Sequence, residues 1–260
     1  METKTALVTG STSGMGLGVA TSLAQKGYHV IMCGSRSTEE ALEAINKVKS
    51  SALQSVDYVQ SDLKTEAGMV SLCKEVDRIC PDGVDVLVNN AGMQHVTPVE
   101  DCTLAKWNEV VAINLTAPFY LISHFVPRMK QKGWGRLINV SSRMGLVASA
   151  NKSPYCATKH GVVGMTKAVS LETAPYGITC NAICPGWVDT PFVQAQVENV
   201  ASQQNISIDD AKKRLFCDSQ PTGKPVQVSQ IAELVLFLCS PGADSMTGTS
   251  FVMDGGTSAK

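Results

Sequence analysis

The sequence lacks an excess of charge of either sign. Its 260 residues include 22 Lys or Arg and 23 Asp or Glu, which gives a formal net charge of -1. Proteins that bind nucleic acid or anionic membranes through bulk charge are strongly basic. No apolar run approaches the roughly 18 to 20 residues of a membrane-spanning helix. We therefore expect neither a nucleic-acid partner nor a membrane partner.

Paired cysteines are also missing. The nine cysteines are scattered, with no C-x-x-C pair and no Cys/His spacing typical of a metal site. An odd number without a framework indicates reduced thiols in a cytoplasmic protein, and no metal site is expected. Residues 1–4 precede the first predicted strand and are too few for a signal or transit peptide.

Strand-like and helical patterns alternate along the chain, which is 44% hydrophobic and 17% charged, a composition typical of globular proteins. The strand-like runs are 5–9, 29–33, 56–60, 84–88, 136–140, 178–184 and 250–253. The helical stretches lie within 14–26, 38–50, 63–79, 104–132, 154–174 and 226–239. This alternation predicts an α/β fold, a Rossmann-type doubly wound parallel sheet of about seven strands with helices on both faces.

No linker, repeat or low-complexity block divides the chain, so we expect a single NAD(P)-binding domain over 1–260. Residues 190–225 break the alternation, because they are polar, helix-prone and long for a connection. Long excursions after a strand end are often lids over an active site. The alternative interpretation is a surface insertion.

A glycine-rich turn, TGSTSGMG over 9–16, connects the first predicted strand to the first predicted helix. Glycines permit a tight turn and a close approach of the backbone to a pyrophosphate, and the helix N-terminus attracts its charge. The spacing differs from G-x-G-x-x-G. The cofactor contacts expected here are Thr9, Gly10, Ser13, Gly14, Met15 and Gly16.

The second predicted strand ends without the acidic residue that would bind the ribose diol of NAD. Arg36, in this position, either holds the 2′-phosphate of NADP or is solvated, and both readings stay open. Asp62 and Leu63, after the third strand, are expected to contact the cofactor, with Asp62 at the adenine. The alternative is that Asp62 caps a helix that starts at Leu63. Small residues in NNAG (89–92) leave room for a cofactor at the end of the fourth strand.

Tyr155 and Lys159 are four residues apart in a predicted helix and therefore lie on one face, one turn apart. An ammonium favours the phenolate of a neighbouring tyrosine, which lowers the pKa of the phenol toward the range of a general acid or base. A hydroxyl must lose its proton when its carbon loses a hydride. The pair therefore indicates redox chemistry between alcohols and carbonyls.

These features together resemble the short-chain dehydrogenase/reductase family along essentially the whole chain. The resemblance implies a nicotinamide cofactor, usually a homotetramer, and a proton exchanged by Tyr155 and assisted by Lys159. The family's catalytic positions fall here on Asn114, Ser142, Tyr155 and Lys159. Its further cofactor contacts fall on Asn90, Ala91, Gly92, Tyr155, Lys159, Pro185, Gly186, Val188 and Thr190.

The roles implied by the resemblance are also chemically reasonable. Lys159 would lower the pKa of Tyr155 and hold the nicotinamide ribose, while Ser142 would hydrogen-bond the substrate oxygen. Ser141 is the competing serine, and Ser142 is preferred because its distance to Tyr155 fits the family spacing. Asn114 either shapes a water-linked proton path through Lys159 or is a satisfied buried amide.

A closer resemblance, over 89–101, 145–155, 159–167 and 178–196, is to the soluble D-3-hydroxybutyrate dehydrogenases. It implies that the substrate carboxylate is bound by Gln94, Lys152 and Gln196, that Trp187 forms a wall, and that Ser142 and Tyr155 meet the reacting oxygen. A short hydroxy acid has little apolar area, so a charge-assisted bond and two amides would have to supply most of its binding. That group uses NAD, which favours NAD here, and Arg36 keeps NADP open.

The chain departs from this group at two places. Met144 stands where the group carries a His, so one carboxylate donor is lost, and Arg143 either replaces it or points away. The group's aromatic residue near the C-terminus is missing from 254–260. The main hypothesis is an NAD-dependent dehydrogenase that interconverts 3-hydroxybutyrate and acetoacetate. The alternatives are an NADP(H)-dependent reductase of another 3-oxo compound or ketone, and a nicotinamide-binding scaffold, which the intact catalytic set disfavours.

Overall fold

A computed structural model describes residues 3–217 and 220–259. Within these residues seven parallel strands form one sheet in the order β3-β2-β1-β4-β5-β6-β7. The strands are β1 (Thr5–Thr9), β2 (His29–Gly34), β3 (Val56–Gln60), β4 (Val86–Asn89), β5 (Gly135–Val140), β6 (Ile178–Pro185) and β7 (Ser250–Met253). The predicted doubly wound parallel sheet is confirmed.

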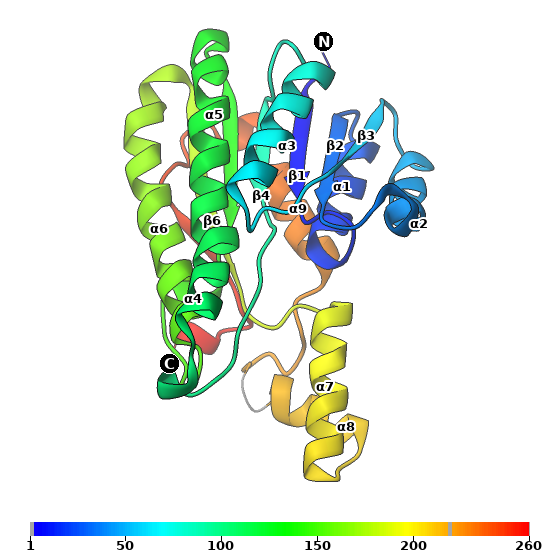
Figure 1. The fold of residues 1–260 in the computed structure, drawn as a ribbon, viewed down its shortest axis with the longest axis vertical. Helices are drawn as coiled ribbons and strands as arrows, with labels where there is room; N and C mark the ends of the chain where they lie inside the picture. The colour runs from blue at the N-terminus through cyan, green and yellow to red at the C-terminus, as the bar shows by residue number, and fades with distance from the viewer. Residues whose placement is uncertain (1–2, 218–219, 260) are drawn as a thin grey trace.

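Two layers of helices cover the sheet (Figure 1). They are α1 (Gly14–Gln25), α2 (Thr38–Lys49) and α9 (Val228–Leu238) on one face, and α3 (Glu66–Ile79), α5 (Ala117–Lys132) and α6 (Ser153–Thr173) on the other. Side chains alternate between the two faces of a strand. In β1, Ala6 and Val8 therefore enter the core beneath α1 and α9, whereas Leu7 enters the core beneath α3 and α5.

The start of α3 corrects one expectation. Thr65, not Asp62, is the N-cap of this helix, and its hydroxyl accepts a hydrogen bond of 3.0 Å from the Gly68 N–H. The helix begins at Glu66, so Leu63 precedes it. The interpretation of Asp62 as a helix cap is therefore wrong, because a threonine three residues later satisfies the free N–H groups.

A second correction concerns the run Leu104–Lys132. Among the described residues it is one helical segment that is long and apolar enough, by length and composition alone, to cross a membrane. The expectation that no run approaches this length is wrong, because α4 (Leu104–Val111), a π-helical turn (Ala112–Thr116) and α5 follow one another without a break. In the structure α5 packs against α3, β5 and α6.

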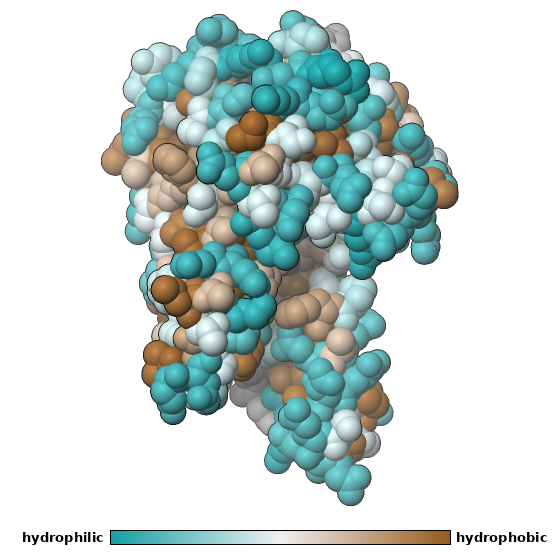
Figure 2. Space-filling model, viewed as in Figure 1, coloured by the Kyte–Doolittle hydropathy of each residue, from teal (hydrophilic) through white to brown (hydrophobic). Residues whose placement is uncertain are grey.

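The segment after β6 forms a small lobe that projects beyond one end of the sheet (Figure 1). It contains α7 (Pro191–Gln204), α8 (Ile208–Lys212) and a π-helical turn (Lys213–Cys217). Its own apolar cluster includes Val193, Val197 and Phe216. Figure 2 shows a groove between this lobe and the part of the body around α4. These elements lie within 190–225, and the role of that range as a lid stays a prediction. Residues 218 and 219 of the range lie outside the described residues, as do 1, 2 and 260 of the predicted domain.

Candidate active site

The glycine turn is packed too tightly for a larger residue at Gly16 and at Gly10, where a Cβ atom would lie 2.9 Å from Ala91 Cα. A Cβ atom on Gly16 would lie 2.3 Å from the Gly10 carbonyl oxygen and 2.4 Å from Asn90 Nδ2. Gly10 and Gly14 have φ values of 63° and 53°, in the left-handed region that favours glycine. The turn therefore brings bare backbone to the N-terminus of α1.

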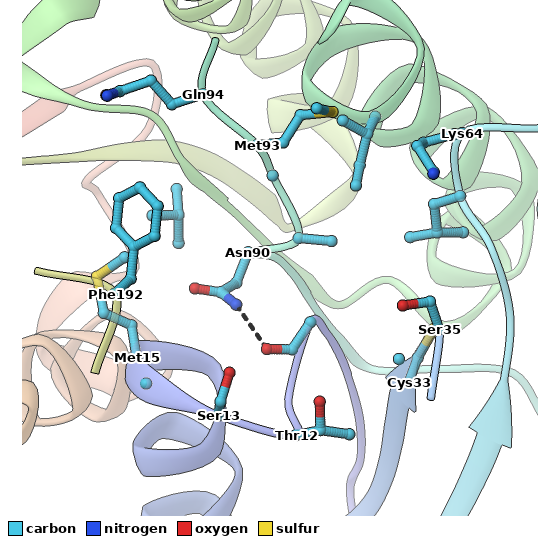
Figure 3. A pocket seen from close by; sticks show the side chains of 18 of the residues that line it. Thr12, Ser13, Met15, Cys33, Ser35, Lys64, Asn90, Met93, Gln94 and Phe192 are labelled. Atoms are coloured by element: carbon cyan, nitrogen blue, oxygen red, sulfur yellow. Dashed lines mark hydrogen bonds between the residues drawn. The ribbon is translucent and has the colours of Figure 1, made fainter. Parts of the chain in front are cut away.

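The support for this turn comes from the end of β4. Asn90 Nδ2 donates hydrogen bonds to the carbonyls of Thr9 (2.9 Å) and Gly10 (3.1 Å), and Figure 3 shows this side chain facing the turn. The Thr9 hydroxyl accepts 3.0 Å bonds from the N–H groups of Asn90 and Ala91. Asn90 and Thr9, both predicted to contact the cofactor, thus have a structural role that the local sequence did not reveal.

A cleft of about 430 Å³ runs from the glycine turn to the tyrosine and lysine of α6 (Figure 3). Among the predicted cofactor contacts it is lined by Gly10, Ser13, Gly14, Met15, Asp62, Leu63, Asn90, Ala91, Gly92, Tyr155, Lys159 and Thr190. Its lining does not include the predicted residues Thr9, Gly16, Arg36, Pro185, Gly186 and Val188.

These residues fit a nicotinamide dinucleotide. Ser13, the N-cap of α1, makes no side-chain capping bond, and the first turn holds no acidic residue, so the helix N–H groups are open to an anion. Asn90 Oδ1 is buried without a hydrogen-bond partner among the described residues. A Cβ on Gly92 would lie 3.6 Å from Lys159 Nζ, so this glycine keeps the far end of the cleft open.

At the adenine end, Arg36 is exposed and its carbonyl accepts a 2.6 Å bond from the Tyr58 hydroxyl. The cleft is instead lined by its neighbour Ser35 and by Lys64, whose ammonium lies 3.7 Å from Asp62. Lys64 is a cation on the cleft that the sequence reasoning missed. Its position next to Asp62 was the available signal.

The tyrosine and lysine of α6 lie one turn apart, with Lys159 Nζ 5.6 Å from the centroid of the Tyr155 ring. Lys159 is buried, donates a 2.8 Å bond to the Val140 carbonyl, and has its pKa lowered to about 8 by burial. Burial raises the pKa of Tyr155, and a hydrogen bond with Ser142 opposes this effect. The expectation that Lys159 brings the Tyr155 pKa down is wrong for this cofactor-free structure, because burial of the phenol dominates.

Two adjacent serines at the end of β5 have different surroundings. The Ser141 hydroxyl is buried and donates a 2.9 Å bond to the Lys159 carbonyl, which fixes α6 to the sheet. The Ser142 hydroxyl accepts a 3.1 Å bond from the Met144 N–H and lies within hydrogen-bond reach of the Tyr155 phenol. Extended backbone turns consecutive side chains to opposite sides, so only Ser142 meets the phenol.

Asn114 lies in the π-helical turn between α4 and α5, and its amide is fully bonded. Its Oδ1 accepts a 2.9 Å bond from the Met93 N–H, and its Nδ2 donates to the Met93 carbonyl (2.9 Å) and to Thr158 Oγ1 (3.1 Å). The side chain therefore ties the segment after β4 to α6. This geometry matches the reading of Asn114 as a satisfied buried amide.

The predicted substrate residues are brought together in part. Lys152 immediately precedes α6, and its Nζ lies 5.8 Å from the centroid of the Trp187 ring. Burial is the largest cause that lowers the pKa of Lys152, and the nearby charge of Arg143 is the second. Gln94 and Tyr155 line the cleft, whereas its lining does not include the predicted substrate residues Ser142, Lys152, Trp187 and Gln196.

The lobe is attached to the site through residues near the end of β6. Gln220 is buried, accepts a 2.8 Å bond from the Trp187 N–H and donates a 2.6 Å bond to the Lys224 carbonyl. Val188 pairs with Val226 in an isolated parallel bridge. Pro185 ends β6, and a Cβ on the following Gly186 would lie 2.6 Å from the Gln220 side chain.

Other cleft residues were not predicted. Phe192, at the start of α7, lines the cleft while 60% exposed, and Figure 3 shows its ring beside Met15 of the glycine turn. Met93 lines the same cleft next to Gln94. An apolar residue at a helix start carries no functional signal in a sequence, so Phe192 could not have been singled out.

Comparison with known proteins agrees with this geometry. The family model described as short chain dehydrogenase matches residues 4–201, and the chain belongs to this family. It is therefore an oxidoreductase of a family that uses the nicotinamide cofactors NAD and NADP.

The chain is 46% identical over 253 residues to a D-beta-hydroxybutyrate dehydrogenase of Cupriavidus necator, a match that covers 97% of each protein. It is 40% identical to a D-beta-hydroxybutyrate dehydrogenase of Rhizobium meliloti, over 99% of this chain and 100% of that one. A crystal structure of a single-residue variant of actinorhodin polyketide ketoreductase with NADPH superposes with a TM-score of 0.91, at 34% identity, over 99% of this chain and 98% of the other.

Proposed function

We propose that the protein is an NAD-dependent dehydrogenase that interconverts D-3-hydroxybutyrate and acetoacetate. The observation that carries the proposal is the position of Lys152, a half-buried cation against Trp187, three residues before Tyr155. A short hydroxy acid needs one site for its hydroxyl and another for its carboxylate. The similarity to two D-beta-hydroxybutyrate dehydrogenases supports the same assignment.

The chemistry divides between the bound nicotinamide, which supplies or accepts the hydride, and groups of the protein. In the reduction direction the Tyr155 phenol, which is protonated at neutral pH, donates its proton to the carbonyl oxygen of the substrate. Ser142 holds that oxygen beside the phenol. In the oxidation direction the hydroxyl proton passes to Tyr155 as the C3 hydride leaves, so oxidation requires the phenolate and becomes faster as the pH rises.

The remaining residues bind and position. Lys159, beside Tyr155, would hold the nicotinamide ribose. Asn114 fixes the neighbouring backbone, and Lys152 with Gln94 binds the substrate carboxylate. Gln196 joins them when the lobe closes, because the first turn of its helix α7 already lines the cleft. In this proposal the lobe is a lid on a single domain that spans the chain.

A second function is favoured by two observations. Met144 is buried with a side chain that cannot donate to a carboxylate, and the end of β2 is followed by the cation Arg36 instead of an acidic residue. The similar ketoreductase structure contains NADPH. The alternative is therefore an NADP(H)-dependent reductase of a neutral or longer 3-oxo compound.

We also propose a homotetramer in the cytoplasm. Exposed apolar residues on α4, α5 and α6, namely Leu104, Trp107, Phe119 and Leu171, support contacts between subunits. The eight cysteines whose side chains the structure describes are free thiols, which supports a reducing compartment. Light scattering coupled to size exclusion gives the mass of the assembly, and a monomer at micromolar concentration contradicts the tetramer.

The decisive experiment follows the absorbance of reduced nicotinamide with purified protein, D-3-hydroxybutyrate and either NAD or NADP. We expect turnover with the D-acid and NAD only, and the L-enantiomer serves as the control. Turnover with neutral ketones and NADPH, without activity on acetoacetate, establishes the alternative. Binding of a cofactor without turnover of any 3-oxo compound contradicts both.

A further inference from the structure

The segments that carry Ser142 and Tyr155 contain cations but no acidic residue. No Asp or Glu occurs in 90–98 or 141–160, and the one acidic residue of 185–197, Asp189, is exposed and accepts a 3.2 Å bond from Gln194 Nε2. The same segments contain Arg143, Lys152 and Lys159. Within the described residues neither Arg143 nor Lys152 forms an ion pair. The site therefore holds positive charge that no group of these segments neutralises.

The two unpaired cations flank the catalytic hydroxyls. Arg143 directly follows Ser142 and begins a short 3₁₀ turn, Arg143–Gly145, while Lys152 precedes Tyr155 by three residues at the N-terminus of α6. The Thr97 N–H donates a 2.9 Å bond to the Asn151 carbonyl, which holds the loop between the cations against the segment that carries Gln94. Arg143 is half-buried, so its side chain is not simply displayed to solvent.

The charges of the two side chains act on one another. The charge of Arg143 lowers the pKa of Lys152, second in size to the effect of burial. Two like charges held together in a partly desolvated place oppose each other, and an anion between them removes this repulsion. The N-terminus of α6, a helix of 21 residues without an acidic first turn, adds a positive dipole end at the same place.

We infer that Arg143 is a specificity-determining residue, which binds the substrate carboxylate jointly with Lys152 and so selects short 3-oxo and 3-hydroxy carboxylates over neutral ketones. A guanidinium offers two parallel N–H donors to a carboxylate, whereas an ammonium acts as a point charge. Arg143 thereby supplies the donor that Met144 cannot. The inference takes from the proposed function that the substrate is a short 3-oxo or 3-hydroxy acid.

The first test compares acetoacetate with its neutral methyl ester in wild type and in Arg143→Ala. We expect kcat/KM for acetoacetate to fall about 10- to 100-fold through KM, the size of one lost charge-assisted hydrogen bond. The ester changes less than about twofold, because no carboxylate bond is lost. Arg143→Lys retains part of the preference for the anion. Lys167→Ala, which removes an exposed cation from α6, leaves both substrates unchanged.

The second test needs no turnover. Calorimetric titration of the cofactor-free protein with acetate measures carboxylate binding directly, and we expect Arg143→Ala to weaken it about tenfold or more. If the protein does not turn over acetoacetate but binds acetate in a way that depends on Arg143, the proposed function is wrong and the inference about Arg143 stands. If the protein turns over acetoacetate, and Arg143→Ala and Arg143→Gln both have the KM and the acetate affinity of the wild type, the inference about Arg143 is wrong and the proposed function stands.

Discussion

At the glycine turn a Cβ atom added to Gly16 would lie 2.3 Å from the Gly10 carbonyl oxygen, so this end of the cleft is tightly packed. At the other end of the same cleft, beside the lobe, Phe192 is 60% exposed, so the packing is open. The nucleotide half of the cleft, around the glycine turn, is made of backbone fixed by the Asn90 amide. The substrate half, toward the lobe, combines side chains of the body, such as Ser142 and Lys152, with side chains of the lobe, such as Phe192. We infer that the first half sets affinity for the cofactor and that the second closes on the substrate.

The largest expected effect lies where the two halves meet. Tyr155→Phe removes the proton donor but keeps the ring, so we expect kcat to fall about 10²- to 10⁴-fold. Cofactor affinity, measured by fluorescence of bound reduced nicotinamide, changes little because the nucleotide half is intact. An unchanged kcat contradicts the assigned role of Tyr155, and a lost cofactor affinity contradicts the separation of the halves.

Lys159 offers a pH-dependent test at the same junction. Its pKa is about 8 in the folded chain against an ordinary 10.5, so between these values the unfolded state binds more protons. The free energy of unfolding therefore rises with pH across this window, by at most about 3 kcal/mol. Below pH 8 the folded protein bears the full cost of burying the charged ammonium. Urea unfolding at pH 7.5 and pH 10 measures the rise, which Lys159→Met should lack. Parallel pH dependences of the two proteins contradict the shifted pKa.

The nucleotide half is tested by Gly16→Ala. The added Cβ would overlap the Gly10 carbonyl and the Asn90 amide, so we expect a loss of about 1–3 kcal/mol in stability together with weaker cofactor binding. Gly164→Ala is the matched control, because no atom lies within 4 Å of its added Cβ and alanine favours a helix by about 0.5–1 kcal/mol. If Gly16→Ala and Gly164→Ala changed cofactor affinity equally, the glycine turn would not be the part of the cleft that sets this affinity.

The smallest expected effect concerns the lobe. Gln220→Ala removes the hydrogen bonds to the Trp187 N–H and the Lys224 carbonyl, at a cost of about 1–2 kcal/mol. We expect KM for the substrate to rise and faster hydrogen exchange in α7, with unchanged cofactor affinity. Gln203→Ala, at an exposed position of α7, is the control and should do neither. Loss of cofactor affinity in Gln220→Ala would show that the lobe supports both halves.

The sheet could be predicted from the sequence because its strands are continuous buried runs between turns. Three strands, Thr5–Thr9, Val56–Gln60 and Ser250–Met253, have the predicted bounds, and the other four differ from prediction by one or two residues at an end. The lobe was predicted as a helix-prone segment, but its apolar core was not predicted. Its signal was present in the spacing of Val193 and Val197, four residues apart on one helix face.

The parts of the site that escaped prediction depend on contacts between distant segments. The amide of Asn90 reaches across 81 residues to Thr9, and that of Gln220 across 33 residues to Trp187. A local pattern identifies an amide near a turn but not the carbonyl that it binds. The π-helical turn around Asn114 was also missed, because a change in backbone hydrogen bonding leaves the apolar pattern of Leu104–Lys132 almost unaltered.

The hydrogen bonds between β4 and the glycine turn also bear on the order in which the chain acquires its shape during synthesis. The turn is complete by residue 16, but the Asn90 amide that holds it is absent until 90 of the 260 residues have been made. Until then β1 lacks β4, one of its two neighbours in the sheet. A cofactor present in the cell therefore stabilises only those nascent chains that have already joined their first strand to their fourth.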